Sequence, residues 1–149
     1  MEITYPCGKE IVEAVLPHRD PFVWVSRVIT CEPGVSVEAE LEVDVALPLF
    51  AGHFPGHPVL PGVILMEALA QAASFCILVE REVAGSIGFL TGIDDAKFRR
   101  QVIPGDTVVL KARIVKSSPR LCVADVEACV DGQVCATARQ KYVLAKAEV

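Results

Sequence analysis

The sequence has few aromatic residues, no excess of basic residues and no closely spaced cysteine pair. Aromatic side chains make up 6% of the 149 residues, so most of the 52% hydrophobic content is Val, Ala, Leu and Ile. Lys and Arg number 14 against 19 Asp and Glu, which gives a net charge of −5. Nucleic-acid-binding domains carry a basic footprint, so we expect no nucleic-acid partner. The composition indicates a globular protein with strands and a tightly packed core.

The distribution of charged and apolar residues predicts neither a secretory leader nor a membrane span. The N-terminal MEITYPCGKE has no basic segment followed by an apolar one, so we expect a cytoplasmic protein. The most apolar run extends from Val63 to Val79 and contains three polar residues, Glu67, Gln71 and Ser74. It is shorter than the roughly 20 apolar residues of a membrane helix, and a central carboxylate is costly in lipid. We therefore predict a buried core helix and no membrane partner.

The six cysteines form no CxxC pair. In a cytoplasmic chain we expect them to stay reduced and to serve as small buried hydrophobic residues. Cys129 and Cys135 flank the Asp131-Gly132 turn, but a two-residue hairpin there pairs Cys129 with Val134. The two sulfurs are then not directly opposite, which argues against a disulfide.

Hydrophobic periodicity predicts a short helix and two strands before the apolar run. The helix covers Lys9 to Leu16, and the first strand covers Phe22 to Cys31. From Val35 to Val43, apolar residues alternate with Ser and Glu, which is typical of a strand with one wet face. A Pro33-Gly34 turn joins the two strands, so we expect an antiparallel hairpin.

A long connection from Asp44 to Leu60 follows, and connections of this length in a compact domain are usually functional. The central helix is predicted from Pro61, a residue that suits the first helical position, to about Val83. Its apolar residues run nearly all round, and the three polar residues named above form a single stripe. Such a stripe must meet polar partners, water or a substrate.

Four more strands are predicted after this helix. They cover Ile87 to Ile93, Thr107 to Lys116, Leu121 to Val130 and Gln133 to Leu144. Two strands, one long helix and four strands predict an α+β fold, with a long central helix wrapped by a curved antiparallel sheet of about six strands. We expect residues 1–149 to form one domain, and we expect a homodimer because a second copy can cover the sheet edges.

A loop histidine and a helix glutamate are the candidate catalytic residues. An imidazole such as His53 is the natural general base near neutral pH. Glu67 lies about a turn and a half inside the helix, where burial among apolar neighbours favours its protonated, acid form. Free N–H groups around Gly62 can hold a carbonyl oxygen that becomes an enolate. This set suits proton removal beside a carbonyl with loss of a β-hydroxyl.

Other interpretations of the histidines stay open. A single loop histidine and a single helix glutamate also occur together without catalysis. His53 and His57 have HxxxH spacing, but such a pair shares a face only in a helix, which Pro55, Gly56 and Pro58 exclude. We therefore expect no metal and no cofactor, and we interpret His57 as ordering the loop. His18, in a corner flanked by prolines, is interpreted as structural.

Three segments of the sequence resemble one enzyme family. HFPGHPVLPGVILMEALAQA closely resembles the central motif of the (3R)-hydroxyacyl-[acyl-carrier-protein] dehydratases of bacterial type II fatty-acid synthesis. LPHRDPFVWVSRV, from Leu16 to Val28, is similar to the family's N-terminal motif, and FLTGIDDAKFRRQVIPGD, from Phe89 to Asp106, to a later one. The segments follow one another in the family's order, and the resemblance as a whole covers most of the chain.

The resemblance implies a hot-dog fold and a hydro-lyase that converts (3R)-hydroxyacyl-acyl carrier protein to the trans-2-enoyl form. His53 and Glu67 match the catalytic pair, which in the family faces across a dimer interface, with one residue from each subunit. Gly62 matches the glycine whose N–H binds the thioester carbonyl. The acyl chain is expected in a tunnel beside the central helix, lined by Gln71, Phe54 and Val63.

The family pattern also implies finer details. The dimer is the unit, and a trimer of dimers is common. A sister family that also isomerises the double bond has Asp where this chain has Glu67, so dehydration without isomerisation is favoured. Two positions depart from the pattern, with Asp20 in place of the usual aromatic residue and Ser26 in place of the usual acid. These departures concern the packing of the corner and an ion pair, not the catalytic residues.

The basic cluster Lys97, Arg99 and Arg100 has two interpretations. It is either a solvated basic loop or the docking site for an acidic acyl carrier protein and its phosphopantetheine phosphate. Two other functions remain open for the whole chain: an acyl thioesterase in which Glu67 activates water, and a non-catalytic acyl-binding module. Release of free thiol identifies the first, and retention of an acyl ligand without conversion identifies the second.

The expected base, acid and oxyanion donors are all protein groups, which predicts turnover without a metal. We expect the purified protein to convert a 3-hydroxyacyl-carrier protein to its trans-2-enoyl form without added metal, as measured by absorbance of the enoyl thioester. Turnover that stops on chelation and returns when a divalent cation is added would contradict this expectation.

Overall fold

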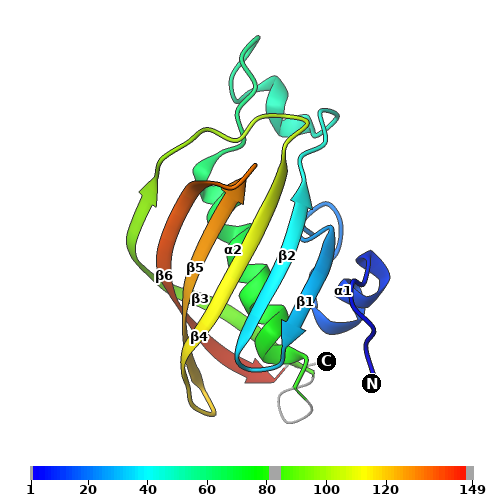
Figure 1. Cartoon of the computed structure of the whole chain (residues 1–149), viewed down its shortest axis with the longest axis vertical. Coiled ribbons are helices and arrows are strands. Elements are labelled where there is room, and N and C mark those ends of the chain that lie inside the picture. The colour runs from blue at the N-terminus through cyan, green and yellow to red at the C-terminus, as the bar shows by residue number, and fades with distance from the viewer. Residues whose placement is uncertain (1, 81–84, 147–149) are drawn as a thin grey trace.

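The computed structural model describes residues 2–80 and 85–146 (Figure 1). Their elements are α1 (Lys9–Val15), β1 (Arg27–Glu32), β2 (Ser36–Glu42), the 3-10 helix η1 (Pro48–Ala51), α2 (Gly62–Leu78), β3 (Ser86–Phe98), β4 (Thr107–Ser117), β5 (Leu121–Val130) and β6 (Gln133–Lys146). Neighbouring strands are antiparallel, in the order β1-β2-β4-β5-β6-β3. The predicted α+β class, with six strands and one long helix, is confirmed.

The sheet curls around α2, which Figure 1 shows running behind the strands. Every residue from Ala68 to Leu78 is buried, as expected of a helix that is apolar nearly all round. Alanines on both surfaces let helix and sheet approach closely, among them Ala72 on α2 and Ala128 on β5. Within the described residues, no helix is both long and apolar enough to cross a membrane.

The hairpin of β1 and β2 forms as predicted, but β1 begins later than Phe22. Val37, Ala39 and Leu41 are buried on the inner face of β2, which confirms the alternation. Trp24 does not join the ladder, because its N–H donates to the side-chain oxygen of Gln71 on α2 at 2.8 Å instead. Ladder hydrogen bonds to β2 start only near Arg27.

Helix α2 ends at Leu78, so the prediction that it continues to about Val83 is wrong for residues 79 and 80, while residues 81–83 lie outside those described. The N–H of Gly34, in the turn between β1 and β2, donates to the Cys76 carbonyl at 3.0 Å. This contact satisfies one of the carbonyls that a helix end leaves free. The first hairpin therefore covers the end of the helix.

The second half of the sheet follows the predicted turns. Asp131 and Gly132 have φ values of 49° and 76°, which suit a two-residue hairpin, and Cys129 pairs with Val134 as expected. All six cysteines are free. Strand β3 continues well past the predicted Ile93, because β6 is long enough to pair with it as far as Phe98.

The two departures from the family pattern have polar contacts of their own. Asp20 forms an ion pair with Lys9 of α1 and so ties the proline-flanked corner to that helix. The hydroxyl oxygen of Ser26 accepts a hydrogen bond from the N–H of Glu42 at 2.9 Å. Neither contact involves α2. The departures therefore affect how the corner and the start of β1 are held, and not the helix that carries Glu67.

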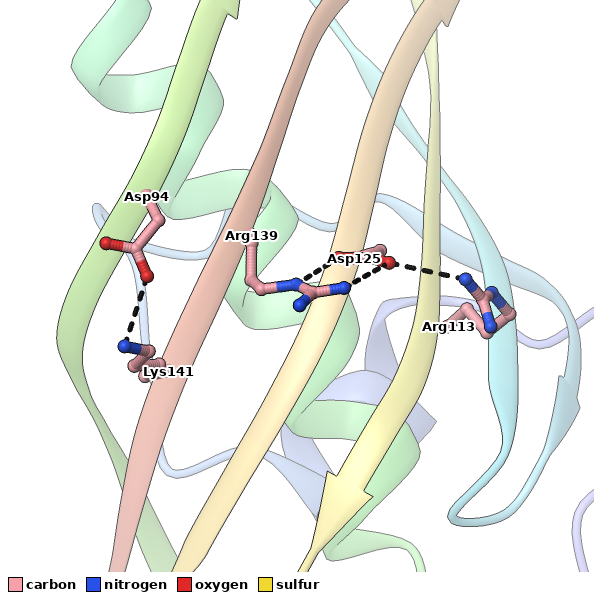
Figure 2. A network of polar contacts seen from close by, with 5 residues as sticks. All are labelled: Asp94, Arg113, Asp125, Arg139 and Lys141. Carbon is pink, nitrogen blue, oxygen red and sulfur yellow. Dashed lines mark hydrogen bonds and ion pairs between the residues drawn. The ribbon is translucent and has the colours of Figure 1, made fainter.

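The outer face of the sheet carries charges of alternating sign. Arg113, Asp125 and Arg139 lie in register on β4, β5 and β6, and Asp125 accepts hydrogen bonds from both arginines (Figure 2). Lys141 pairs with Asp94 on the neighbouring strand at 3.1 Å. Arg139 holds the pKa of the Asp125 carboxyl below its usual range. Such exposed pairs contribute little to stability, and they identify this face as the solvated one.

Packing of β4 against α2 makes a prediction about stability. Leu110 is fully buried on β4, whereas Val115 on the same strand is exposed. We expect Leu110→Ala to lower the free energy of unfolding by about 2–5 kcal/mol. The control Val115→Ala should cost less than about 1 kcal/mol. Urea denaturation measures both, and equal losses would show that this inner-face position does not support the core.

Candidate active site

His53 lies in the connection between β2 and α2, at the base of a tight turn. Phe54 and His57 close this turn with two backbone hydrogen bonds of 3.0 and 2.8 Å, and the Val59 N–H donates to the His53 carbonyl at 3.0 Å. The His53 Nδ1 atom lies 2.7 Å from the Val59 carbonyl oxygen. A carbonyl oxygen can only accept, so Nδ1 carries the proton. Nε2 is therefore the free, basic nitrogen.

The surroundings of His53 are partly apolar. Its ring stacks on that of Phe54, with centroids 4.1 Å apart and planes at 27°. Phe54 is itself exposed, and His57 shapes the turn through its backbone. No group of three or more His, Cys, Asp or Glu side chains in the described parts of the chain is arranged to hold a metal ion.

Glu67 lies in the second turn of α2, and its side chain is 24% exposed. Its Oε2 atom accepts a hydrogen bond from the Gln71 Nε2 at 3.1 Å. The Nε2 atom of His18 lies 3.7 Å from the same oxygen. The carboxyl group is thus less enclosed than an apolar helix suggests, and it has polar neighbours on its own helix and on the N-terminal corner.

Gln71 connects the helix to the corner that precedes β1. It is only 1% exposed, and its side-chain oxygen accepts a hydrogen bond from the Trp24 N–H at 2.8 Å. Its Nε2 donates to the Phe22 carbonyl at 2.9 Å as well as to Glu67. Both N–H groups of the amide are therefore used, and the network fixes which end of the amide is oxygen. Gln71 holds the corner and the Glu67 carboxyl together.

Gly62 begins α2, and its neighbour on β3 explains why a glycine fits there. The Pro61 carbonyl accepts hydrogen bonds from the N–H groups of Ile64 and Leu65, so the Gly62 N–H precedes the first bonded positions of the helix. A Cβ atom at position 62 would lie 2.8 Å from the Phe98 ring. The close approach at this glycine is therefore made by Phe98, next to the exposed Val63.

The two candidate catalytic residues have separate polar partners in the described chain. The contacts of His53 lie within its own loop, while those of Glu67 lie on α2 and the N-terminal corner. No hydrogen bond or ion pair among the described residues joins His53 to Glu67. Each residue presents an unused polar atom, Nε2 of His53 and Oε1 of Glu67.

The basic cluster divides into two parts. Lys97 and Arg99 are exposed near the end of β3. Arg100 is partly buried, and its guanidinium donates to the Val130 carbonyl at 2.9 Å. Arg100 thus fastens the end of β5, which leaves the other two side chains as the outward-facing cations of the cluster.

Sequence reasoning missed three residues around Glu67. His18 was interpreted as structural, and Gln140 and Tyr142 were not singled out. Gln140 is fully buried on β6, where its Nε2 donates to the Met66 carbonyl at 3.0 Å and its oxygen accepts from the Tyr142 hydroxyl. Burial raises the pKa of Tyr142, with smaller contributions from Cys122 and Glu67. The alternation of β6 places Gln140 on the apolar face, a signal that could have found it.

A hollow on the outer face of the sheet has Lys97 and Arg99 in its lining, but not His53, Gly62 or Glu67. Further charged side chains line it, including Lys111, Arg113, Asp125 and Arg139, and Figure 2 shows the ion pairs that join the last three. An acyl chain requires apolar walls, so this surface is not the candidate site. The site lies on the helix side of the sheet.

Comparisons with known proteins agree with this geometry. A family model described as the FabA-like domain matches residues 16–139. A 3-hydroxyacyl-[acyl-carrier-protein] dehydratase FabZ from Ruminiclostridium cellulolyticum is 45% identical over 140 residues, which is 94% of this chain and 98% of that relative.

Solved structures share the fold. The dehydratase heterocomplex ApeI:P from Xenorhabdus doucetiae matches with a TM-score of 0.79 at 21% identity, over 97% of this chain and 93% of that one. A mutant thioesterase from Pseudomonas aeruginosa matches with a TM-score of 0.59 at 17% identity, over 80% of each chain. These likenesses confirm the predicted hot-dog fold. They do not select a chemistry, because both activities occur on it.

The Gln71 network makes a prediction about stability. Gln71→Leu removes the partners of the Trp24 N–H and the Phe22 carbonyl, so we expect the free energy of unfolding to fall by about 2–4 kcal/mol. The control Gln133→Leu replaces an exposed glutamine on β6 and should change it by about 0.5 kcal/mol or less. Thermal or urea denaturation measures both, and a neutral Gln71→Leu would mean that the corner is held by other contacts.

Proposed function

Because this chain belongs to the FabA-like family, we propose that it dehydrates (3R)-hydroxyacyl chains on an acyl carrier protein to trans-2-enoyl chains in fatty-acid biosynthesis. The relative that is 45% identical across nearly the whole length is a dehydratase of this kind, so the enzyme is a hydro-lyase. The proposed setting is the cytoplasm. The observation that carries the residue assignment is the tautomer of His53, whose Nδ1–H is committed to Val59 and whose Nε2 is free.

His53 is the proposed general base. Its Nε2 removes the α-proton beside the thioester carbonyl, and the electron pair of the broken C–H bond moves toward the carbonyl. As Nε2 takes up this proton, the imidazole becomes positively charged. The Val59 carbonyl, which accepts the hydrogen bond from Nδ1–H, then stabilises that charge and keeps the ring in place.

Gly62 and the start of α2 are proposed to stabilise the enolate. Its N–H comes before the first hydrogen-bonded positions of the helix, at the end where the helix dipole is positive. An N–H held in this way costs no reorganisation when negative charge develops on the carbonyl oxygen. A side chain at position 62 would displace Phe98, which supports a requirement for glycine there.

Glu67 is the proposed general acid. As the enolate collapses, its electron pair forms the Cα–Cβ double bond and the C–O bond to the β-hydroxyl breaks. The proton of Glu67 is transferred to the departing oxygen, which leaves as water. The acid then stands as a carboxylate and His53 as an imidazolium, and exchange of one proton with solvent at each restores the starting state.

A homodimer is the proposed working unit, because the two edges of the sheet differ. At the β1 edge, Cys7 and Val28 exchange two backbone hydrogen bonds of 2.9 Å, so the N-terminal segment covers that strand. At the other edge no described strand lies beyond β3, which exposes Phe89, Ile93 and Phe98. Pairing of β3 with a second copy would cover this edge. Larger assembly into a trimer of dimers is the extension that the family resemblance suggests.

Each site is proposed to combine His53 from one copy with Glu67 from the other. The separate contacts of the two residues within one chain support this arrangement. The acyl tunnel would then pass the exposed side chains of Phe54, in the loop, and Val63, in the first turn of α2. Gln71 lies further along the same helix. Gln71 would act there through its hydrogen bond to Glu67.

The acyl carrier protein is the proposed macromolecular partner. Lys97 and Arg99 offer two exposed cations near the end of β3, which suit an acidic carrier and its phosphopantetheine phosphate. Arg100 belongs to the same segment, but its guanidinium is engaged with Val130. Its proposed part in docking is therefore to hold that segment in place.

Loss of the base or the acid should abolish dehydration without unfolding the protein. We expect His53→Ala and Glu67→Gln each to lower kcat by about 10²–10⁴-fold, with circular dichroism unchanged. The control His57→Gln changes the exposed imidazole of the same loop and should keep kcat within about 2-fold. Enoyl absorbance measures turnover, and unchanged rates in either of the first two variants would refute the assignment.

Mixing the two inactive variants tests whether a site is shared. With random exchange of subunits, half of the dimers are hybrids, and each hybrid contains one intact pair. We therefore expect recovery of about one quarter of the parent activity after exchange. Subunit exchange is followed separately with two different affinity tags. Complete exchange without recovered turnover would mean that each site takes both residues from one copy.

A further inference from the structure

His18 lies against the proposed acid, yet the mechanism above does not use it. Its side chain is 21% exposed, and its Nε2 is 3.7 Å from the Oε2 atom of Glu67. Its other ring nitrogen, Nδ1, is buried and has no hydrogen-bond partner in the described structure. Buried polar atoms normally have a partner, so the orientation of this imidazole requires an explanation.

The charge state of His18 follows from its surroundings. Burial lowers the pKa of His18, and the nearby Arg19 lowers it further, while the carboxylate of Glu67 acts in the opposite direction. Arg19 itself lies 3.6 Å from Glu13, so part of its charge is compensated. Tyr142 on β6 also interacts electrostatically with Glu67, but burial raises the pKa of its hydroxyl, so Tyr142 stays neutral. At neutral pH His18 is therefore an uncharged imidazole with one N–H.

The position of that proton is decided by Glu67. With the proton on Nδ1, a buried N–H would have no acceptor, and the Nε2 lone pair would face the lone pairs of Oε2. With the proton on Nε2, the N–H points toward Oε2 and only an acceptor is left unpaired at Nδ1. An unpaired acceptor is less costly than an unpaired N–H facing no acceptor, so the second tautomer is favoured.

The two oxygens of Glu67 are then unequal. Oε2 faces two donors, the Gln71 amide at 3.1 Å and the His18 Nε2–H at 3.7 Å. The His18 distance exceeds a hydrogen bond, but such contacts are often long before substrate binds and tighten in the complex. Two donors on Oε2 leave no room for a proton there, so the acidic proton must be carried by Oε1.

We propose that His18 is a positioning residue which, together with Gln71, holds Oε2 of Glu67 so that the acidic proton stays on Oε1 and faces the leaving hydroxyl. This inference rests on the proposed role of Glu67 as the general acid. His18 does not contact the substrate in this scheme. It acts through Glu67, by keeping one oxygen as the fixed acceptor and the other as the proton carrier.

The test compares a variant that keeps an N–H donor with one that does not. His18→Gln can still donate to Oε2, whereas His18→Met fills similar space without a donor. We expect His18→Met to lower kcat about 10-fold with KM within about 2-fold, and His18→Gln to restore most of the loss. The control is His57→Gln, which should leave both constants unchanged.

The outcomes separate this inference from the proposed function. If Glu67→Gln is inactive but His18→Met keeps the parent kcat, His18 does not position the acid. Equal losses in His18→Met and His18→Gln would also overturn the inference, because a donor at this position would then have no effect. If Glu67→Gln itself remains active, the proposed function fails first.

A second measurement does not depend on the folding of any variant. ¹⁵N chemical shifts of the imidazole in the unaltered protein distinguish the two neutral tautomers. We expect His18 to carry its proton on Nε2 and His53 to carry its proton on Nδ1 at neutral pH. A His18 proton on Nδ1, or a charged His18, would overturn the inference.

Discussion

The buried amide of Gln71 is the interaction on which the arrangement of the site depends. It lies inside a helix that is otherwise apolar, and each of its polar groups has a partner. Those partners are the backbone at Phe22 and Trp24 and the carboxyl of Glu67. A fully paired network of this kind stabilises one geometry, because removal of any member leaves others buried without a partner. The same amide therefore holds both the residues before β1 and the carboxyl of the proposed acid.

The proposed reaction site at the start of α2 depends on what surrounds that helix end. Alanines let the sheet close around the middle of the helix, and the first hairpin covers its end at Cys76. The beginning of the helix has no such cover, and Phe98 reaches Gly62 from the open edge strand β3. The edge that exposes apolar residues and the helix end that exposes N–H groups thus lie together. A second copy at this edge would enclose the site and supply its base.

Much of the fold was predictable because it depends on the spacing of apolar residues and on turn residues that are close together in the sequence. The bounds of β5 follow from the turns on either side of it, and the Asp131-Gly132 hairpin follows from local backbone chemistry. The start of β1 was not predictable, because it depends on Gln71 far along the chain. For the site, residue types suggested His53 and Glu67. The contact between His18 and Glu67 joins residues far apart in the sequence, and no sequence pattern indicates it. The role of Arg100 became clear only from its hydrogen bond to Val130.

Two imidazoles of the same chain receive opposite tautomers from their surroundings. At His53 a backbone carbonyl faces Nδ1, so the proton resides there and Nε2 is left as a base. At His18 the Oε2 atom of Glu67 lies 3.7 Å from Nε2, while Nδ1 is buried without a partner among the described residues. In the proposed mechanism the first arrangement leaves a proton acceptor, and the second supplies a donor that does not exchange its proton with substrate. Under this proposal one residue type serves both halves of an acid–base reaction, and the difference is made by the oxygen that each ring contacts.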